Sequence, residues 1–187
     1  MAPQSPEPSG RPGSAVAPLD LRLASAADAR WIADLQVRAW RAAYRGLLPD
    51  ALLDNLSIDD RERVWRRWNV GDPRRRIWLA VRGDALIGFA ATGPSRDDDV
   101  TAVTGEVYAI YLEPALIGTG LGRTLFAHAV DALRAQGFTV CTLWVLENNA
   151  RTRRFYEAAG WQIDGARKTE RMAGGELIEV RYRRALS

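Results

Sequence analysis

The chain has 187 residues, of which 47% are hydrophobic, with a formal net charge of +3 and an isoelectric point near 9.4. This length suffices for one sizeable core, so we expect one domain and no separate modules. There is no run of eighteen apolar residues, which argues against a membrane-spanning protein. Charges of both signs are interspersed and basic residues do not alternate with aromatic ones, so we expect no nucleic-acid partner.

The first seventeen residues are rich in Pro, Ser and Gly and lack the apolar core of a secretory signal. We therefore expect a disordered leader over residues 1–17 and a folded domain over residues 18–187. Cys141 is the single cysteine, which excludes an internal disulfide, and one His with one Cys cannot form a zinc site. We accordingly expect no metal and a cytoplasmic location.

The first elements follow from apolar spacing and capping signals. Alternation over residues 19–23 predicts a half-buried strand, and Ser25 with Asp28 resembles a capping box that starts a helix. This helix should turn Trp31 inward and end near Gly46. Further helices are predicted over 50–56 and 58–68, followed by hairpin strands over 77–81 and 85–91.

An acidic loop, residues 97–99, precedes the central strand and is expected to be mobile and solvated. The alternative is that its negative charge attracts a cationic amine. The remaining predicted elements are a strand over 107–112, a helix after Gly122, a strand over 139–146, a helix after Asn149, and closing strands over 162–166 and 178–183 around Gly174-Gly175. Their order predicts an α/β fold with a mixed, largely antiparallel sheet flanked by helices.

A glycine-rich turn connects the strand over 107–112 to the next helix. Gly118, Gly120 and Gly122 lack Cβ atoms, so the backbone there can approach a ligand closely. The first amides of the helix have no helical partner and favour an anion such as phosphate. The spacing matches neither a dinucleotide fingerprint nor a Walker loop, and a purely structural glycine turn stays open as an alternative.

A second informative stretch runs from residue 139 to Trp161. An apolar strand is followed by Glu-Asn-Asn-Ala-Arg-Thr-Arg-Arg-Phe-Tyr-Glu-Ala-Ala-Gly-Trp, which predicts a helix that begins at an Asn cap and ends at Gly160. Taken together, Ile-Tyr-Leu-x-Pro, the Gly-x-Gly-x-Gly turn and this Asn…Phe-Tyr-Glu-x-x-Gly-Trp segment resemble the Gcn5-related N-acetyltransferases (GNAT). The resemblance covers the chain from Leu19 to its end.

The resemblance implies an enzyme that moves an acetyl group from acetyl-CoA to a primary amine by direct transfer in a ternary complex. The acceptor would be a small-molecule amine or an amine of a peptide or protein, and family members often form homodimers. The alternative is an acyl-CoA-binding module that senses the cofactor without catalysing transfer. A nucleophilic triad around His128 is not expected, because no serine or cysteine motif accompanies it.

Cofactor-binding positions are also carried over from the family. The pantetheine arm would lie along the backbone of Ile110, Tyr111 and Leu112, and Asn149 would bond it, with Asn148 as the alternative. The pyrophosphate would bind at the turn and its flanking arginine, namely Ile117, Gly118, Thr119, Gly120, Leu121, Gly122 and Arg123. Many family members have Arg or Gln in place of Ile117, a departure that should affect affinity more than activity.

Two catalytic roles follow from the same comparison. Glu106 would accept the amine proton, often through water, or else be a surface glutamate at a strand end. Tyr156 would protonate the departing thiolate, since a phenol is protonated at neutral pH, or else be a core residue. Trp40 and Tyr44 are candidates for acceptor contact, although aromatic residues at four-residue spacing are more often core.

Overall fold

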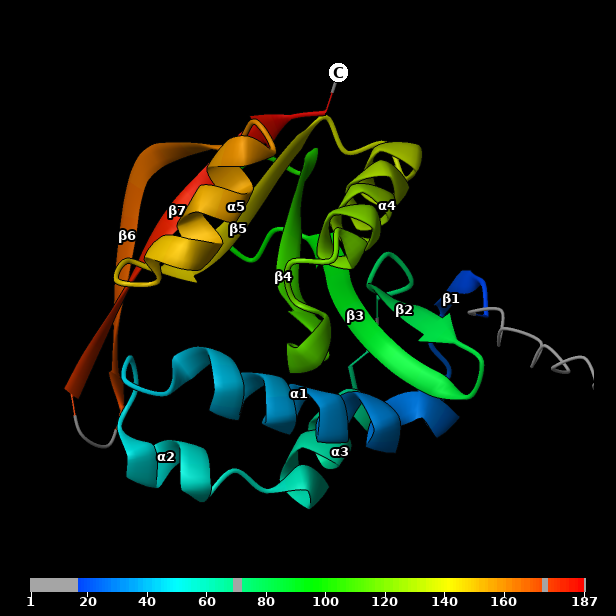
Figure 1. Cartoon of the computed structure of the whole chain (residues 1–187). Helices are drawn as coiled ribbons and strands as arrows, with labels where there is room; N and C mark the ends of the chain where they lie inside the picture. The colour runs from blue at the N-terminus through cyan, green and yellow to red at the C-terminus, as the bar shows by residue number, and fades with distance from the viewer. Residues whose placement is uncertain (1–16, 69–71, 173–174, 187) are drawn as a thin grey trace, which may run out of the picture.

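The computed structural model describes residues 17–68, 72–172 and 175–186. Residues 1–16 of the expected leader and Gly174 of the closing turn lie outside the described residues. One mixed sheet runs through the molecule in the order β1-β2-β3-β4-β5-β7-β6 (Figure 1). Its strands are β1 Leu19–Leu23, β2 Arg76–Arg82, β3 Ala85–Pro94, β4 Thr104–Leu112, β5 Val140–Leu146, β6 Gln162–Met172 and β7 Gly175–Ala185. Neighbouring strands are antiparallel except β4 and β5, which confirms the predicted fold class.

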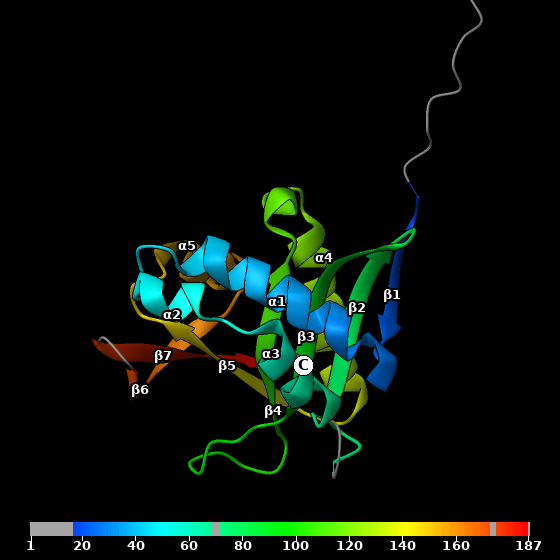
Figure 2. The same ribbon diagram turned by 90° about the horizontal axis from the view of Figure 1, so that it is seen from below.

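The helices cover both faces of the sheet. They are α1 Ala29–Tyr44, α2 Asp50–Asp54, α3 Ile58–Arg66, α4 Leu121–Ala135 and α5 Ala150–Ala158. The first three lie on one face and α4 and α5 on the other (Figures 1 and 2). Within the described ranges, no helix has both the length and the apolar character that crossing a membrane requires.

Each helical layer has its own core against the sheet. Ile32, Leu35 and Trp65 bring α1 and α3 onto β2 and β3, while Leu125 and Phe126 belong to clusters that pack α4 on the opposite face. The expectation for Trp31 was wrong, because its side chain is 37% exposed while its neighbour Ile32 is buried. One residue advances an α-helix by about 100°, so adjacent residues rarely share a face.

A bulge in β4 sets which side chains face the site. Thr92 of β3 pairs with Val107 and Ala91 pairs with Ala109, which leaves Tyr108 as an extra residue. As a result, Tyr108 and Ala109 both pack toward the α1 and α3 layer, whereas Val107 packs toward α4 and α5. Without the bulge these neighbours would alternate between the two faces.

The two parallel strands at the centre of the sheet pair for only part of their length. Residues Thr104–Val107 of β4 pair with Val140–Leu143 of β5, and no pairs between the two strands follow in the described structure. Both strands continue, β4 to Leu112 and β5 to Leu146. Backbone groups on the separated edges therefore face a gap inside the sheet, and this gap leads into the candidate site.

Candidate active site

A cavity of about 950 Å³ opens where β4 and β5 separate. One wall is formed by α1 and the segment that follows it, and the opposite wall by the start of α5 and the β6–β7 hairpin. The expected site residues that line it are Trp40, Tyr44, Glu106, Ile110, Tyr111, Leu112, Ile117, Gly122, Asn149 and Tyr156. The remaining ones lie in the adjoining turn and the start of α4: Gly118, Thr119, Gly120, Leu121 and Arg123. The structure thus brings the predicted residues into one region.

The glycine turn presents free backbone donors. Within the described structure, no hydrogen bond is donated by the amides of Gly118, Gly120, Leu121 and Gly122, whereas the amide of Thr119 donates to Leu116 O at 3.3 Å. The Ile117 amide is likewise engaged, with Pro114 O at 3.3 Å. Of the six backbone amides from Ile117 to Gly122 that were expected to bind the pyrophosphate, four are therefore free. We call these four amides at the N-terminus of α4 the anion cradle.

Backbone conformation explains the glycines at two of these positions. Gly118 and Gly120 have φ angles of +93° and +89°, a region that L side chains rarely adopt. A Cβ atom added at either residue would meet nothing within 4 Å. The space beside the free amides is therefore open, as binding of a pyrophosphate group requires.

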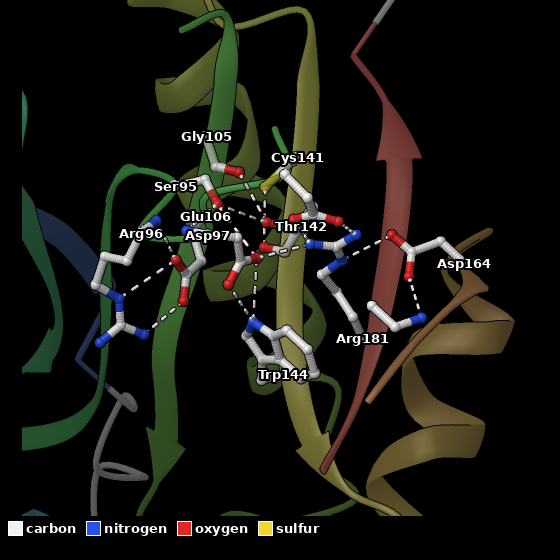
Figure 3. A network of polar contacts seen from close by, with 12 residues as sticks. Ser95, Arg96, Asp97, Gly105, Glu106, Cys141, Thr142, Trp144, Asp164 and Arg181 are labelled. Atoms are coloured by element: carbon white, nitrogen blue, oxygen red, sulfur yellow. Dashed lines mark hydrogen bonds and ion pairs between the residues drawn. The ribbon is translucent and has the colours of Figure 1, made fainter. Parts of the chain in front are cut away.

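Glu106 lies inside the molecule, with 1% of its surface exposed, so the alternative of a surface glutamate was wrong. Arg96 holds its carboxylate (Figure 3): the Arg96 amide donates to Oε2 at 3.0 Å, Nε donates to Oε2 at 3.3 Å, and Nη2 donates to Oε1 at 2.5 Å. Burial is the largest single effect on Arg96 and works against its charge, but the hydrogen bond to Glu106 and the nearby negative charges together outweigh it, so the pKa of the guanidinium is raised. The carboxylate of Glu106 therefore has a fixed orientation at the cavity wall.

The acidic loop that carries Arg96 is exposed at Asp98 and Asp99, as expected, but ion pairs anchor it to the sheet. Arg181 of β7, only 5% exposed, pairs with Asp97 at 3.1 Å, with Asp99 at 2.6 Å and with Asp164 at 2.7 Å. The indole of Trp144 also donates to Asp97 (Figure 3). The hydrogen bond to Asp99 is the largest of the effects that raise the pKa of Arg181. These contacts fix the loop beside Glu106 and leave Asp97 and Asp99 little freedom to attract a ligand.

Tyr156 of α5 is 5% exposed and packs in an aromatic cluster, with ring centroids 5.4 Å from Phe126 and 6.0 Å from Tyr182. Its hydroxyl has no hydrogen-bond partner among the described residues, although the residue lines the cavity. Burial raises the pKa of Tyr156 well above its ordinary value of about 10. The phenol is therefore a neutral hydrogen-bond donor whose hydroxyl is not used by the fold.

The cap of α5 is Asn149, and the prediction of an Asn cap is confirmed at this residue. Its Oδ1 accepts a hydrogen bond from the amide of Thr152 at 3.1 Å, and the residue is 7% exposed. Asn148 is adjacent and also lines the cavity, so both amides border the gap between β4 and β5.

Trp40 and Tyr44 occupy a position between core and cavity. Their rings meet edge to face at 5.2 Å, and both pack against the small cluster formed by Leu48, Leu53 and Leu146. Both also line the cavity, where Trp40 lies 6.5 Å from Tyr111. The two side chains therefore form an aromatic wall. This position is consistent with both predictions from the sequence, acceptor contact and a core role.

Two reactive side chains have no place in the site. His128 packs edge to face on Trp78 at 4.4 Å, outside the cavity lining. Cys141 is buried and its burial raises the pKa of the thiol, which makes it unreactive. Neither forms part of a nucleophilic triad in the described structure.

Sequence reasoning missed Arg96 and Arg181. Arg96 lies ten residues before Glu106, in the connection between β3 and β4, and the register Gly93–Glu106 carries it back over the carboxylate. The hairpin register is the signal that could indicate this neighbour, whereas the run of aspartates in the loop does not. Arg181 contacts Asp97 and Asp99 over more than eighty residues, and no local pattern signals such a pair.

Comparison with known proteins completes the description of the site. Residues 36–161 match the family model for the acetyltransferase (GNAT) family. The uncharacterized N-acetyltransferase YuaI of Bacillus subtilis is 31% identical over 130 residues, which cover 69% of this chain and 72% of that protein. The structure of yncA from Salmonella typhimurium, solved with its cofactor acetyl-CoA, has a TM-score of 0.65 and 22% identity and covers 90% of this chain and 94% of that one.

A third similarity involves longer proteins. The mycothiol acetyltransferase of Frankia casuarinae is 32% identical over 160 residues, which cover 81% of this chain. The match spans 46% of that relative, so less than half of its length has a counterpart here.

Proposed function

We propose that this chain, which belongs to the acetyltransferase (GNAT) family, transfers an acetyl group directly from acetyl-CoA to a primary amine while both are bound. Acetyl-CoA-dependent N-acetylation is the activity of the family, and acetyl-CoA is the donor. The proposal rests mainly on one observation: Gly122, at the end of the turn with free amides, lines the same cavity as Tyr156 and Glu106.

The residues of the glycine turn fit the pyrophosphate of the donor. The amides of Gly118, Gly120, Leu121 and Gly122 are free, and the helix dipole of α4 favours negative charge at this end. Arg123 is exposed in the first turn of α4, where it can add a charge-assisted hydrogen bond. Ile117 and Thr119 shape the turn and contribute contacts other than their amides.

The pantetheine arm fits the separated edge of β4. Ile110, Tyr111 and Leu112 pair with β3 on one side and with no strand on the other in the described structure. An extended amide-containing chain can bond the free edge as an added strand does. Asn149, at the start of α5, faces the same gap and would bond the arm from the β5 side.

Glu106 accepts the proton of the attacking amine. Its carboxylate is fixed by Arg96. Oε2 accepts two hydrogen bonds from this residue, whereas Oε1 accepts one and keeps a lone pair for a water molecule or the amine itself. Because Glu106 is buried and its carboxylate is held by Arg96, transfer through a water molecule suits this arrangement better than direct contact with the amine.

Tyr156 supplies the proton for the departing thiolate. Acetyl-CoA provides the acetyl group as a thioester, and the thiolate that leaves needs a donor in a site with little water. The raised pKa of Tyr156 keeps its phenol protonated, and its hydroxyl has no competing partner in the described fold. Its ring is held by the surrounding aromatic side chains, which orient the hydroxyl.

The acceptor is an amine of a small molecule or of a peptide or protein, with Trp40 and Tyr44 forming one wall of its site. A homodimer and a cytoplasmic location are part of the same proposal, the location because the single cysteine leaves no internal disulfide to form. Charges of both signs are interspersed, which gives no reason to propose a nucleic-acid or membrane partner.

The Arg96–Glu106 pair also favours a second candidate function. A carboxylate already neutralised by arginine would be of little use as a base, as expected for a module that binds acyl-CoA without transferring the acyl group. Release of free thiol from acetyl-CoA in the presence of a panel of primary amines separates the two functions. Binding of acetyl-CoA without amine-dependent thiol release would support the sensing module.

Replacement of Glu106 tests the catalytic assignment. Glu106→Gln should lower kcat most at pH values below the pKa of the acceptor amine, where proton removal is most needed. Because the amide would also face the guanidinium of Arg96, the double variant Glu106→Gln/Arg96→Met is the matched control for stability. If Glu106 is the base, the double variant recovers thermal stability but not activity. An unchanged pH profile in Glu106→Gln would remove this residue from the mechanism.

A further inference from the structure

Among the described residues of the cavity lining, Arg61 is the half-buried cation that has no carboxylate partner. We infer that Arg61 of α3 binds an anionic group of the acceptor, so that the preferred acceptor is an amine that also carries a carboxylate or phosphate. This inference rests on the proposed function, because it concerns the substrate of that same site.

The other cations of the cavity lining differ from Arg61 in pairing or exposure. Three have a carboxylate partner: Arg45 with Asp50 and Asp54, Arg96 with Glu106, and Lys168 with Glu179. The fourth, Arg151, makes no ion pair among the described residues but is exposed at the start of α5. Arg61 lines the same cavity and makes no ion pair or side-chain hydrogen bond within the described residues. It is half-buried, so the charge is only partly solvated.

The position of Arg61 suits recognition of a ligand. Its guanidinium carbon lies 5.5 Å from the centre of the Trp40 ring, a cation–π contact that holds the charge on the aromatic wall. The Trp40 ring is also a neighbour of Tyr111 of β4, with ring centroids 6.5 Å apart. An anion bound by Arg61 would therefore be the distal end of an acceptor whose apolar body lies along Trp40 and whose amine points toward β4.

Glu170 of β6 is the residue that would favour the opposite class, a polycationic acceptor. It also lines the cavity and has no ion pair among the described residues. Its position is exposed at the rim, however, where solvent screens a charge more strongly than at the half-buried Arg61. Guanidinium and carboxylate groups also match in geometry, so an anion gains directional hydrogen bonds from Arg61.

The test compares two pairs of probes that differ in one charge. N-acetyl-L-tryptophan and its carboxamide represent the acetylated product with and without a carboxylate, and binding to the protein saturated with coenzyme A is measured by calorimetry. We expect the carboxylate to bind about tenfold or more tightly than the amide, the effect of one charge-assisted hydrogen bond. Initial rates of thiol release with L-tryptophan and L-tryptophanamide should show the same order in kcat/KM.

Variants of Arg61 and of two other residues show whether Arg61 causes the preference for the carboxylate. Arg61→Met should remove the preference and leave coenzyme A affinity unchanged, and Arg61→Lys should restore part of it. Arg63→Met is the control, because Arg63 lies on the same helix, pairs with Asp60 and is absent from the cavity lining. Glu170→Gln should leave the preference intact.

Three results would overturn the inference. These are equal binding of the two probes, tighter binding of the amide, or no binding of either at millimolar concentration. Higher kcat/KM with spermidine than with L-tryptophan, abolished by Glu170→Gln, would identify a cationic acceptor instead. Failure of the proposed function looks different, because the protein would then release no thiol with any amine whatever its charge.

Discussion

Removal of one hydroxyl at Tyr156 separates catalysis from folding. Tyr156→Phe keeps the ring among its aromatic neighbours and deletes a hydroxyl that has no partner in the described structure. Because no hydrogen bond of the fold is lost, the free energy of unfolding should change by less than about 0.5 kcal/mol. If the hydroxyl protonates the leaving thiolate, kcat should fall by about 100- to 10,000-fold. This loss corresponds to about 3–5 kcal/mol in the barrier.

Tyr182→Phe is the matched control, because it should lower stability and leave kcat unchanged. The Tyr182 hydroxyl donates to Glu157 at 2.6 Å and accepts from Arg153 at 3.1 Å, and the residue is absent from the cavity lining. Loss of these contacts should cost about 1–3 kcal/mol of stability. The value of kcat should remain near that of the wild type at temperatures where the variant is folded.

Thiol release under saturating acetyl-CoA and an accepted amine gives kcat, and chemical denaturation gives the stability. Tyr156→Phe should lower kcat and leave stability unchanged, whereas Tyr182→Phe should lower stability and leave kcat unchanged. A Tyr156→Phe enzyme with full kcat would refute the assignment of the acid. A large loss of stability in Tyr156→Phe would show instead that the hydroxyl is bonded within the fold.

Substitutions at three other positions test the binding of coenzyme A at the glycine turn, the anchoring of the acidic loop and the acid sensitivity of the fold. Gly120→Ala and Gly120→Glu should both lose about 1–2 kcal/mol of stability, because each places a side chain at a positive φ. Only Gly120→Glu should abolish acetyl-CoA binding in calorimetry. If the two variants bind acetyl-CoA with equal affinity, the turn is not the anion cradle. Arg181→Met leaves Asp97 and Asp164 without their partner, and should cost about 3–5 kcal/mol of stability in denaturant titrations and lower kcat with it, whereas a wild-type midpoint would show that the loop holds itself. The hydrogen bond from Arg22 lowers the pKa of Asp28, so Asp28 stabilises the fold above its unfolded pKa of about 3.9; Asp28→Asn should reduce stability at pH 7 and weaken its decline in acid, and parallel pH curves for the two proteins would contradict this.

Local patterns predicted the elements that build the site. The strand over 107–112, the glycine turn and the Asn cap before α5 each depend on neighbouring residues, and each is present at the expected place. The ends of several elements differ: α3 ends at Arg66, not residue 68, and β6 begins at Gln162 but continues to Met172. The strand pairing that extends β6 comes from β7, a partner that sequence periodicity does not identify.

The charges of the site could not be predicted in the same way. Glu106 was expected to be either the base for the acceptor amine or a surface residue; it is buried, and its ion pair with Arg96 was not foreseen. Its partner Arg96 reaches it through the β3–β4 register and the bulge at Tyr108, both of which depend on the whole sheet. The ion pairs of Arg181 likewise join β7 to a loop far away in the sequence.

The most direct test of the central claim uses the glycine amides themselves. Protein labelled with ¹⁵N-glycine would be titrated with coenzyme A, and the amide resonances of Gly118, Gly120 and Gly122 followed by NMR. If the glycine turn binds the pyrophosphate, these three resonances shift downfield together and saturate with the calorimetric affinity, since each amide gains an anionic acceptor. If coenzyme A binds while these resonances stay in place, the glycine turn is not the cofactor cradle.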